Sequence, residues 1–135
     1  MVALCYDAEQ VILGRRIISD HQFGFQVRET ESALMVDVAG HIDGLNAEEF
    51  QAGLNEKVRA YEGSAVILDL ATLTYISSAG LRAILVTAKI LHAKGKKFAI
   101  CSLSETVGSM VKTAGFDKVI DVYGSSSEAV SAVTC

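Results

Sequence analysis

The segment 65–70, with the sequence AVILDL, constrains the fold of this chain most strongly because five of its six residues are apolar. A nearly continuous run of apolar and β-branched residues is typical of a strand that is buried on both faces of a parallel sheet. We therefore expect this segment to be a central strand with helices on either side of the sheet.

The remaining segments alternate between strand and helix patterns. Apolar residues at every second position predict two strands, over residues 23–27 and 34–38, that form a hairpin. Residues 47–61 show helical spacing, with Asn46 as the expected N-cap and Glu49 as its capping-box partner. The later elements are a helix over 78–94, a strand over 97–101, a helix after Ser104, a strand over 118–122 and a helix after Ser125. This order predicts one α/β domain with a mixed, mostly parallel sheet covered by about four helices.

The predicted domain occupies residues 23–135. Residues 1–22 stand apart because their apolar residues follow no clear period. They are expected to be an N-terminal extension that forms an extra strand, a first helix or a dimer arm. A chain of 135 residues suits a single globular unit, since domains commonly contain about 150 residues.

Composition and charge exclude several classes of function. The net charge of −4 provides no basic surface of the kind that binds nucleic acid. No apolar run approaches the roughly 20 residues that span a bilayer, and no signal peptide is visible, so we expect a cytoplasmic protein without membrane insertion. The three cysteines and three histidines are scattered, and Gly-rich phosphate-binding motifs are missing, which predicts neither a metal site nor a cofactor.

Ser77 and Ser78 lie where the central strand is expected to meet the next helix. The position is similar to a hydrolase nucleophile elbow, G-x-S-x-G, but Ile76 replaces the first glycine. The only later histidine, His92, is roughly 21 Å from Ser78 along the same helix, at about 1.5 Å per residue. No catalytic residue is therefore expected, and the chain is predicted not to be an enzyme.

A different use of the two serines follows from their place at the start of a helix. Serine is a preferred N-cap, which accounts for one of the two hydroxyls. The second suits a site that accepts a phosphoryl group, because the N-terminus of a helix stabilises a negative charge.

The helix over residues 78–94 is apolar on two sides. The stripe expected to face the core consists of Leu81, Ile84, Leu85, Ala88 and Leu91. The stripe on the opposite side consists of Ala83, Val86, Ile90 and Ala93 and is bordered by Arg82. Such a helix either packs between other elements or binds a partner, and we expect the second stripe to bind a partner.

Two motifs occur together in this chain: residues 66–85, VILDLATLTYISSAGLRAIL, and residues 38–43, VAGHID. Their sequences, their spacing and the order of the surrounding elements resemble those of STAS domains, specifically the bacterial anti-sigma factor antagonists. The resemblance covers about residues 23 to 134 and leaves residues 1–22 without a counterpart.

The resemblance implies that Ser78 is phosphorylated by a partner anti-sigma factor that is a serine kinase. In that family the unphosphorylated antagonist binds the anti-sigma factor and frees the sigma factor, and a metal-dependent serine phosphatase restores this form. Asp43 corresponds to an acidic loop residue near the phosphorylated serine. Ser77 replaces an Asp of well-known members and is either an alternative acceptor or the N-cap, and Ala79 replaces a frequent Ser or Thr. With the second helix stripe, the predicted partner surface consists of Asp43, Ser77, Ser78, Ala79, Arg82, Ala83, Val86 and Ile90.

A second function is compatible with the same fold. STAS domains also serve as structural subunits of lipid-transport ABC systems and of stress-sensing assemblies, where the second helix stripe would contact a fixed partner without a phosphorylation switch. A second copy of the chain, in a homodimer, is a further candidate partner.

Overall fold

A computed structural model describes residues 23–30 and 33–134, so the expected N-terminal extension, residues 1–22, lies outside the described part of the chain. The strands within it are β1 (Phe23–Glu29), β2 (Leu34–Ile42), β3 (Ala65–Ile76), β4 (Lys97–Cys101) and β5 (Asp121–Tyr123). The helices are α2 (Ala47–Ala60), α3 (Ser78–Ala93), α4 (Glu105–Thr113) and α5 (Ser126–Thr134), with a 3-10 turn, η1 (Phe116–Lys118), before β5.

The five strands form one sheet in the order β1-β2-β3-β4-β5. The hairpin partners β1 and β2 are antiparallel, whereas β2, β3, β4 and β5 run parallel to their neighbours. Each parallel connection passes through a helix, namely α2, α3 or α4. The predicted α/β fold with a mixed, mostly parallel sheet and β3 at its centre is confirmed.

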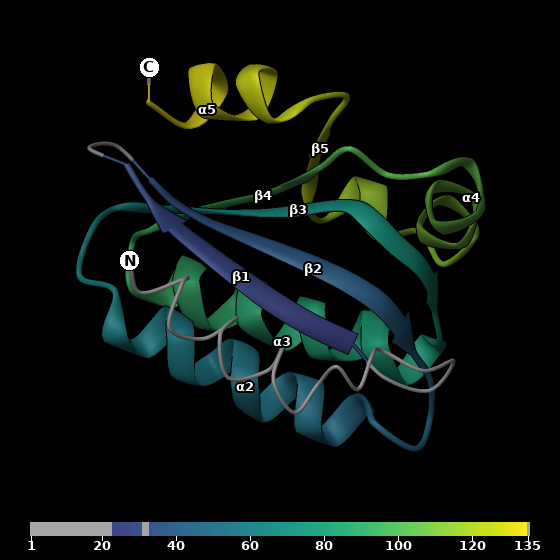
Figure 1. Cartoon of the computed structure of the whole chain (residues 1–135). Helices are drawn as coiled ribbons and strands as arrows, with labels where there is room; N and C mark the ends of the chain where they lie inside the picture. The colour runs from purple at the N-terminus through teal and green to yellow at the C-terminus, as the bar shows by residue number, and fades with distance from the viewer. Residues whose placement is uncertain (1–22, 31–32, 135) are drawn as a thin grey trace.

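Helices cover both faces of the sheet, which explains the continuous apolar run in β3. Figure 1 shows α2 and α3 on one side of the sheet and α5 on the other. Val66 and Leu68 belong to the larger core cluster, to which α2, α3 and α4 also contribute. Ile67, which points the other way, belongs to the smaller cluster beneath α5. Successive residues of β3 therefore fill two separate cores.

The strand predicted over residues 118–122 is wrong in position and length. The chain leaves α4 through Gly115, whose φ of +79° is accessible to glycine, and then forms η1. The carbonyl of Phe116 accepts hydrogen bonds from the N–H groups of Val119 and Ile120, at 2.9 and 2.8 Å. These bonds keep the backbone coiled until Ile120, and only residues 121–123 pair with β4.

Candidate functional site

Ser77 and Ser78 lie at the edge of the sheet where β2 and β3 end together. Ile42 and Ile76 are paired in the parallel register, and the Ser77 N–H donates to the Ile42 carbonyl at 2.8 Å. Asp43 is the next residue after Ile42. The two motifs of the sequence, 38–43 and 66–85, are therefore joined by the sheet at the point where α3 begins.

Ser77 is the N-cap of α3. Its backbone is extended, with φ of −85° and ψ of 173°, and its side-chain oxygen accepts a hydrogen bond from the Gly80 N–H at 3.2 Å. Its carbonyl accepts the first helical bond, from the Leu81 N–H at 2.9 Å. The Ser77 hydroxyl is therefore occupied in starting the helix, as one of the two sequence interpretations expects.

Ser78 is the first residue of α3, and its side chain is exposed. Within the described residues its hydroxyl makes no hydrogen bond to a protein group. The N-terminus of a helix carries a partial positive charge and free N–H groups, and Ser78 lies in that environment. An exposed hydroxyl in this position is accessible to a second protein.

Gly80 fixes the first turn of α3 against the sheet. It is buried, and a Cβ atom at this position would lie 2.7 Å from Ile42 Cγ2 and 2.7 Å from Ile76 Cγ1. Side chains of both isoleucines are fully buried. The absence of a side chain at Gly80 thus allows α3 to approach the ends of β2 and β3 closely, which sets the position of Ser78.

Asp43 holds the loop that lies beside Ser77. Its Oδ1 accepts hydrogen bonds from the Leu45 and Asn46 N–H groups at 2.9 and 3.2 Å. Asn46 is buried; its Oδ1 accepts from the Asp43 N–H at 2.8 Å, and its Nδ2 donates to the His41 carbonyl at 3.0 Å. Asp43 and Asn46 therefore satisfy each other's backbone N–H groups.

The capping box predicted between Asn46 and Glu49 is consequently wrong. Asn46 is the N-cap residue of α2, as predicted, but its side chain makes no capping hydrogen bond to the helix. The reciprocal arrangement is present three residues earlier, between Asp43 and Asn46. Asn and Asp both form local hydrogen bonds from the side chain to the backbone. The sequence therefore predicts a reciprocal pair of such bonds near Asn46 but not which two residues form it.

His41 and Tyr75 were not among the predicted site residues, yet they lie at the same edge of the sheet. They are partners across β2 and β3, and their rings stack with centroids 4.7 Å apart and planes at 22°. His41 Nε2 is 3.4 Å from Asp43 Oδ2. His41 lies near the end of β2, and Asp43 is the first residue after that strand.

The outward face of α3 is narrower than the sequence predicts. Leu81, Ile84 and Leu91 are buried, as expected for the core stripe, whereas Ala83 of the second stripe is also fully buried. Contacts between α2 and α3 explain this difference, because α2 packs along that side of α3. Ala83 therefore cannot contact a partner directly. The predicted surface residues that remain accessible on α3 are Ser78, Ala79, Arg82, Val86 and Ile90.

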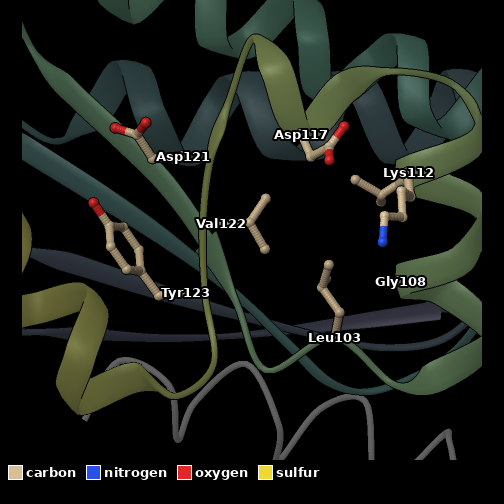
Figure 2. A pocket seen from close by; sticks show the side chains of 8 residues that line it. Leu103, Gly108, Lys112, Asp117, Asp121, Val122 and Tyr123 are labelled. Carbon is tan, nitrogen blue, oxygen red and sulfur yellow. The ribbon is translucent and has the colours of Figure 1, made fainter.

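A separate hollow of about 550 Å³ lies between α4, η1 and β5. Its lining includes Leu103, Val111 and Val122, and Figure 2 shows Lys112 and Asp117 at its rim. None of the residues that line it belongs to the predicted site. Within the described residues, no group of three or more His, Cys, Asp or Glu side chains is arranged to hold a metal ion.

The arrangement around Ser78 lacks the features of an activated nucleophile. A nucleophilic serine needs a base within hydrogen-bond distance, but the Ser78 hydroxyl bonds neither to His41 nor to Asp43. His92 lies in the last turn of α3, at the other end of the helix.

Comparison with known proteins decides the family. The family model of the STAS domain matches residues 24–129. The chain belongs to the STAS domain family. Both motifs, Asp43 and Ser78 lie inside the matched region, which includes nearly all of the described part of this STAS domain.

Relatives of this STAS domain are named as anti-sigma factor antagonists. BtrV of Bordetella bronchiseptica, described as a candidate anti-sigma factor antagonist, is 34% identical over 102 residues, which are 76% of this chain and 87% of BtrV.

Two solved structures share its fold. An anti-sigma factor antagonist from Mycobacterium paratuberculosis matches with a TM-score of 0.78 and 20% identity, covering 87% of this chain and 98% of that one. The phosphorylated form of the Bacillus cell fate determinant SpoIIAA matches with a TM-score of 0.61 and 18% identity, over 82% of this chain and 99% of that one.

The helices of the STAS domain are short and amphipathic. Among the described residues, no helix combines the length and the apolar character needed to cross a membrane.

Proposed function

We propose that this chain is an anti-sigma factor antagonist controlled by phosphorylation of Ser78. The unphosphorylated form binds an anti-sigma factor that is also a serine kinase, and this binding releases the sigma factor. The kinase then phosphorylates Ser78, which ends the binding, and a serine phosphatase restores the active form. This function is exerted in the cytoplasm through protein contacts alone, without catalysis by the chain, a cofactor, nucleic acid or membrane insertion.

The observation that carries the proposal is the state of the Ser78 hydroxyl. It is exposed at the first residue of α3 and makes no hydrogen bond among the described residues, whereas the neighbouring Ser77 hydroxyl is bonded to Gly80. Of these two serines, Ser78 can therefore accept a phosphate without loss of a helix cap, and Ser77 cannot. Ser78 is therefore the better acceptor of the two.

A phosphate on Ser78 is compatible with the fold but not with an interface. It would add a charge of about −2 at a helix N-terminus, where the helix dipole stabilises an exposed anion by roughly 0.3 to 1 kcal/mol. A partner that covers Ser78 would have to remove water from this charge, which is unfavourable without a cation opposite it. The partner surface proposed here consists of Asp43, Ser77, Ser78, Ala79, Arg82, Val86 and Ile90.

The relatives support this proposal in two ways. BtrV, described as a candidate anti-sigma factor antagonist, is 34% identical to this chain over most of both sequences. SpoIIAA, which shares the fold, has been solved in a phosphorylated form. The second fact supports a STAS domain that remains folded while it carries a phosphate.

Phosphorylation by the cognate kinase tests the proposal. The full chain is incubated with ATP and a purified histidine-kinase-like ATPase of the anti-sigma factor class, and phosphopeptides are mapped by mass spectrometry. Phosphate is expected on Ser78 in the wild type and in Ser77→Ala, and absent in Ser78→Ala. Phosphate that is found only at another residue would contradict the assignment.

Binding to the same ATPase tests the switch. Ser78→Ala is expected to bind like the unphosphorylated wild type, and Ser78→Asp much more weakly. Ser109→Asp, which adds the same charge at an exposed position of α4, is the matched control and should bind normally. Equal binding by Ser78→Asp and the wild type would instead favour a structural subunit with a fixed partner.

A further inference from the structure

The charge of this chain is distributed unevenly, and the part that contains α3 is basic. The net charge is −4, yet no Asp or Glu occurs between Asp69 and Glu105. The basic residues of this interval are Arg82, Lys89, Lys94, Lys96 and Lys97. The acidic character of the chain therefore comes from other segments, and the surface of α3 differs in sign from the protein as a whole.

Some of these basic residues stabilise the fold. Lys96 donates a hydrogen bond from Nζ to the Tyr61 carbonyl at 3.0 Å, and so ties β4 to the end of α2. Lys94 is the C-cap residue of α3, where a positive charge interacts favourably with the helix dipole. Their presence needs no partner to explain it.

Arg82 and Lys89 have no comparable structural role. Both side chains are exposed, and among the described residues neither forms an ion pair or a hydrogen bond through its charged group. Arg82 lies in the second turn of α3, near the positive end of the helix dipole, so its charge gains nothing from the helix. Their charges are therefore available to another molecule.

Arg82 and Lys89 also share the outward face of α3 with Ser78. At about 100° per residue, positions 78, 82 and 89 lie within roughly 40° of one another around the helix. Val86, which is half-buried, and the exposed Ile90 flank this line. The α3 strip is the name used below for these four residues of the helix, Arg82, Val86, Lys89 and Ile90.

We propose that the α3 strip binds an acidic surface of the anti-sigma factor, with Arg82 and Lys89 as its two cationic contacts. This inference rests on the proposed function and names the chemistry of the partner surface. The apolar side chains of Val86 and Ile90 would be covered by the partner, and complementary charges around them would set orientation and the rate of association.

The α3 strip also gives the phosphate on Ser78 a specific target. Arg82 is four residues after Ser78, about 6 Å further along the helix axis, and oppositely charged side chains at this spacing pair with each other. A phosphate would therefore add about −2 charge to the strip and would also engage Arg82. Both changes weaken the attraction of the strip for an acidic surface, so one modification removes the partner's contact and adds repulsion.

Charge reversal within the strip is the direct test. Arg82→Glu/Lys89→Glu changes the charge of the strip, and Lys112→Glu/Lys118→Glu makes the same net change on α4 and η1 as a matched control. Affinity of the full-length chain for the purified anti-sigma kinase is measured with a non-hydrolysable ATP analogue. The strip variant is expected to bind about ten-fold more weakly or worse, and the control within about two-fold of the wild type, because exposed charge pairs contribute modestly each.

Salt dependence and neutral variants separate charge from packing. Wild-type affinity is expected to fall as NaCl is raised from low to high concentration, since salt screens exposed charges. The neutral pair Arg82→Gln/Lys89→Gln should lose part of the affinity and most of the salt dependence. Its folding is verified by its urea midpoint, so that loss of binding is not confused with loss of structure.

A partner-independent measurement distinguishes failure of the strip from failure of the proposed function. On a column of immobilised poly-glutamate at low salt, the wild type and the control variant should be retained longer than the strip variant. Equal elution of all three would overturn the strip as an acid-binding surface. Normal kinase binding by the strip variant, while Ser78→Asp fails to bind, would overturn the inference and leave the phosphorylation switch intact. Absence of any phosphate on Ser78 would instead refute the proposed function.

Discussion

Substitution of Gly80 by alanine tests whether the close contact between α3 and the sheet determines the stability of the site. The new Cβ would lie 2.7 Å from Ile42 Cγ2 and from Ile76 Cγ1, and 3.2 Å from Ile76 Cδ1. Separations under about 3 Å are too short for carbon atoms in contact. Both isoleucines are fully buried, so neither side chain can move into solvent, and α3 or the strand ends must shift.

The magnitude follows from two opposing effects. Overpacking a well-packed core typically costs about 1 to 3 kcal/mol. Alanine is favoured over glycine within a helix by about 1 kcal/mol, which offsets part of this cost. Gly80→Ala is therefore expected to reduce the free energy of unfolding by about 1 kcal/mol.

Gly108→Ala provides a matched control within the same chain. Gly108 lies in α4, and a Cβ there would meet only Leu103 Cβ at 3.6 Å and Leu103 Cδ1 at 4.0 Å, which is ordinary contact. The helix preference for alanine then acts unopposed, and the variant should be more stable by about 0.5 to 1 kcal/mol. The same chemical change is thus expected to have opposite signs in the two helices.

Urea unfolding followed by circular dichroism measures both variants. A difference of about 2 kcal/mol between them, with a slope near 2 kcal/mol per molar, separates their midpoints by roughly 1 M urea. Gly80→Ala should also slow phosphorylation of Ser78 because the first turn of α3 moves. If Gly80→Ala is stabilised as much as Gly108→Ala, the close approach of α3 to Ile42 and Ile76 does not constrain the site, and the reasoning is refuted.

Three further predictions concern the hydrogen bonds and the thiol. Asn46→Ala should lower the free energy of unfolding by about 2 kcal/mol, since it removes the hydrogen bonds of the Asn46 side chain with the Asp43 N–H and the His41 carbonyl. Glu49→Gln should change it by less than about 0.5 kcal/mol, and equal effects of the two variants in urea unfolding would contradict the assigned pairing. Ser77→Ala should cost about 1 kcal/mol through loss of the helix cap, and Ser77→Asp should retain most of the stability, as measured by thermal unfolding. Burial raises the pKa of the Cys101 thiol, so the contribution of this thiol to stability is complete below the ordinary thiol pKa of about 8.5 and is lost as the pH rises further. The wild type should therefore lose stability more steeply than Cys101→Ala between pH 8 and 10. Parallel stability profiles of the two proteins would argue against this linkage.

The fold could be predicted from the sequence because its strongest pattern has one physical solution. A strand as apolar as residues 65–70 must be covered on both faces, and the helical segments before and after it are long enough to do so. Local hydrogen-bond chemistry also predicted the serine cap of α3, which the Ser77 side chain provides. The strand prediction over residues 118–122 was wrong at its start, because the bonds of Val119 and Ile120 to the Phe116 carbonyl keep the chain in a turn until β5 begins at Asp121.

The site was predictable only where it depends on neighbours in the sequence. Ser77, Ser78 and Gly80 are consecutive or nearly so, and their roles follow from the start of one helix. The stacking of His41 on Tyr75 depends on the register between two strands, and the burial of Ala83 depends on the path of α2. Periodicity within a single helix cannot reveal which of its faces a second helix covers, so the width of the partner surface had to come from the structure.

The two adjacent serines differ in what their hydroxyl groups do in the fold. Ser77 provides the hydrogen bond that starts α3, and this leaves the Ser78 hydroxyl without a structural role within the described residues. A phosphate on Ser78 therefore changes charge without removing a cap, and the fold persists while the surface changes. The whole chain has a net charge of −4 and stays negative when a phosphate is added, whereas the surface of α3 is basic. The effect of the phosphate therefore depends on its position beside α3. A phosphate on Ser78 would lie within the longest stretch of this domain without Asp or Glu, residues 70–104, so under the proposed function one modification changes the charge of a surface that extends along α3.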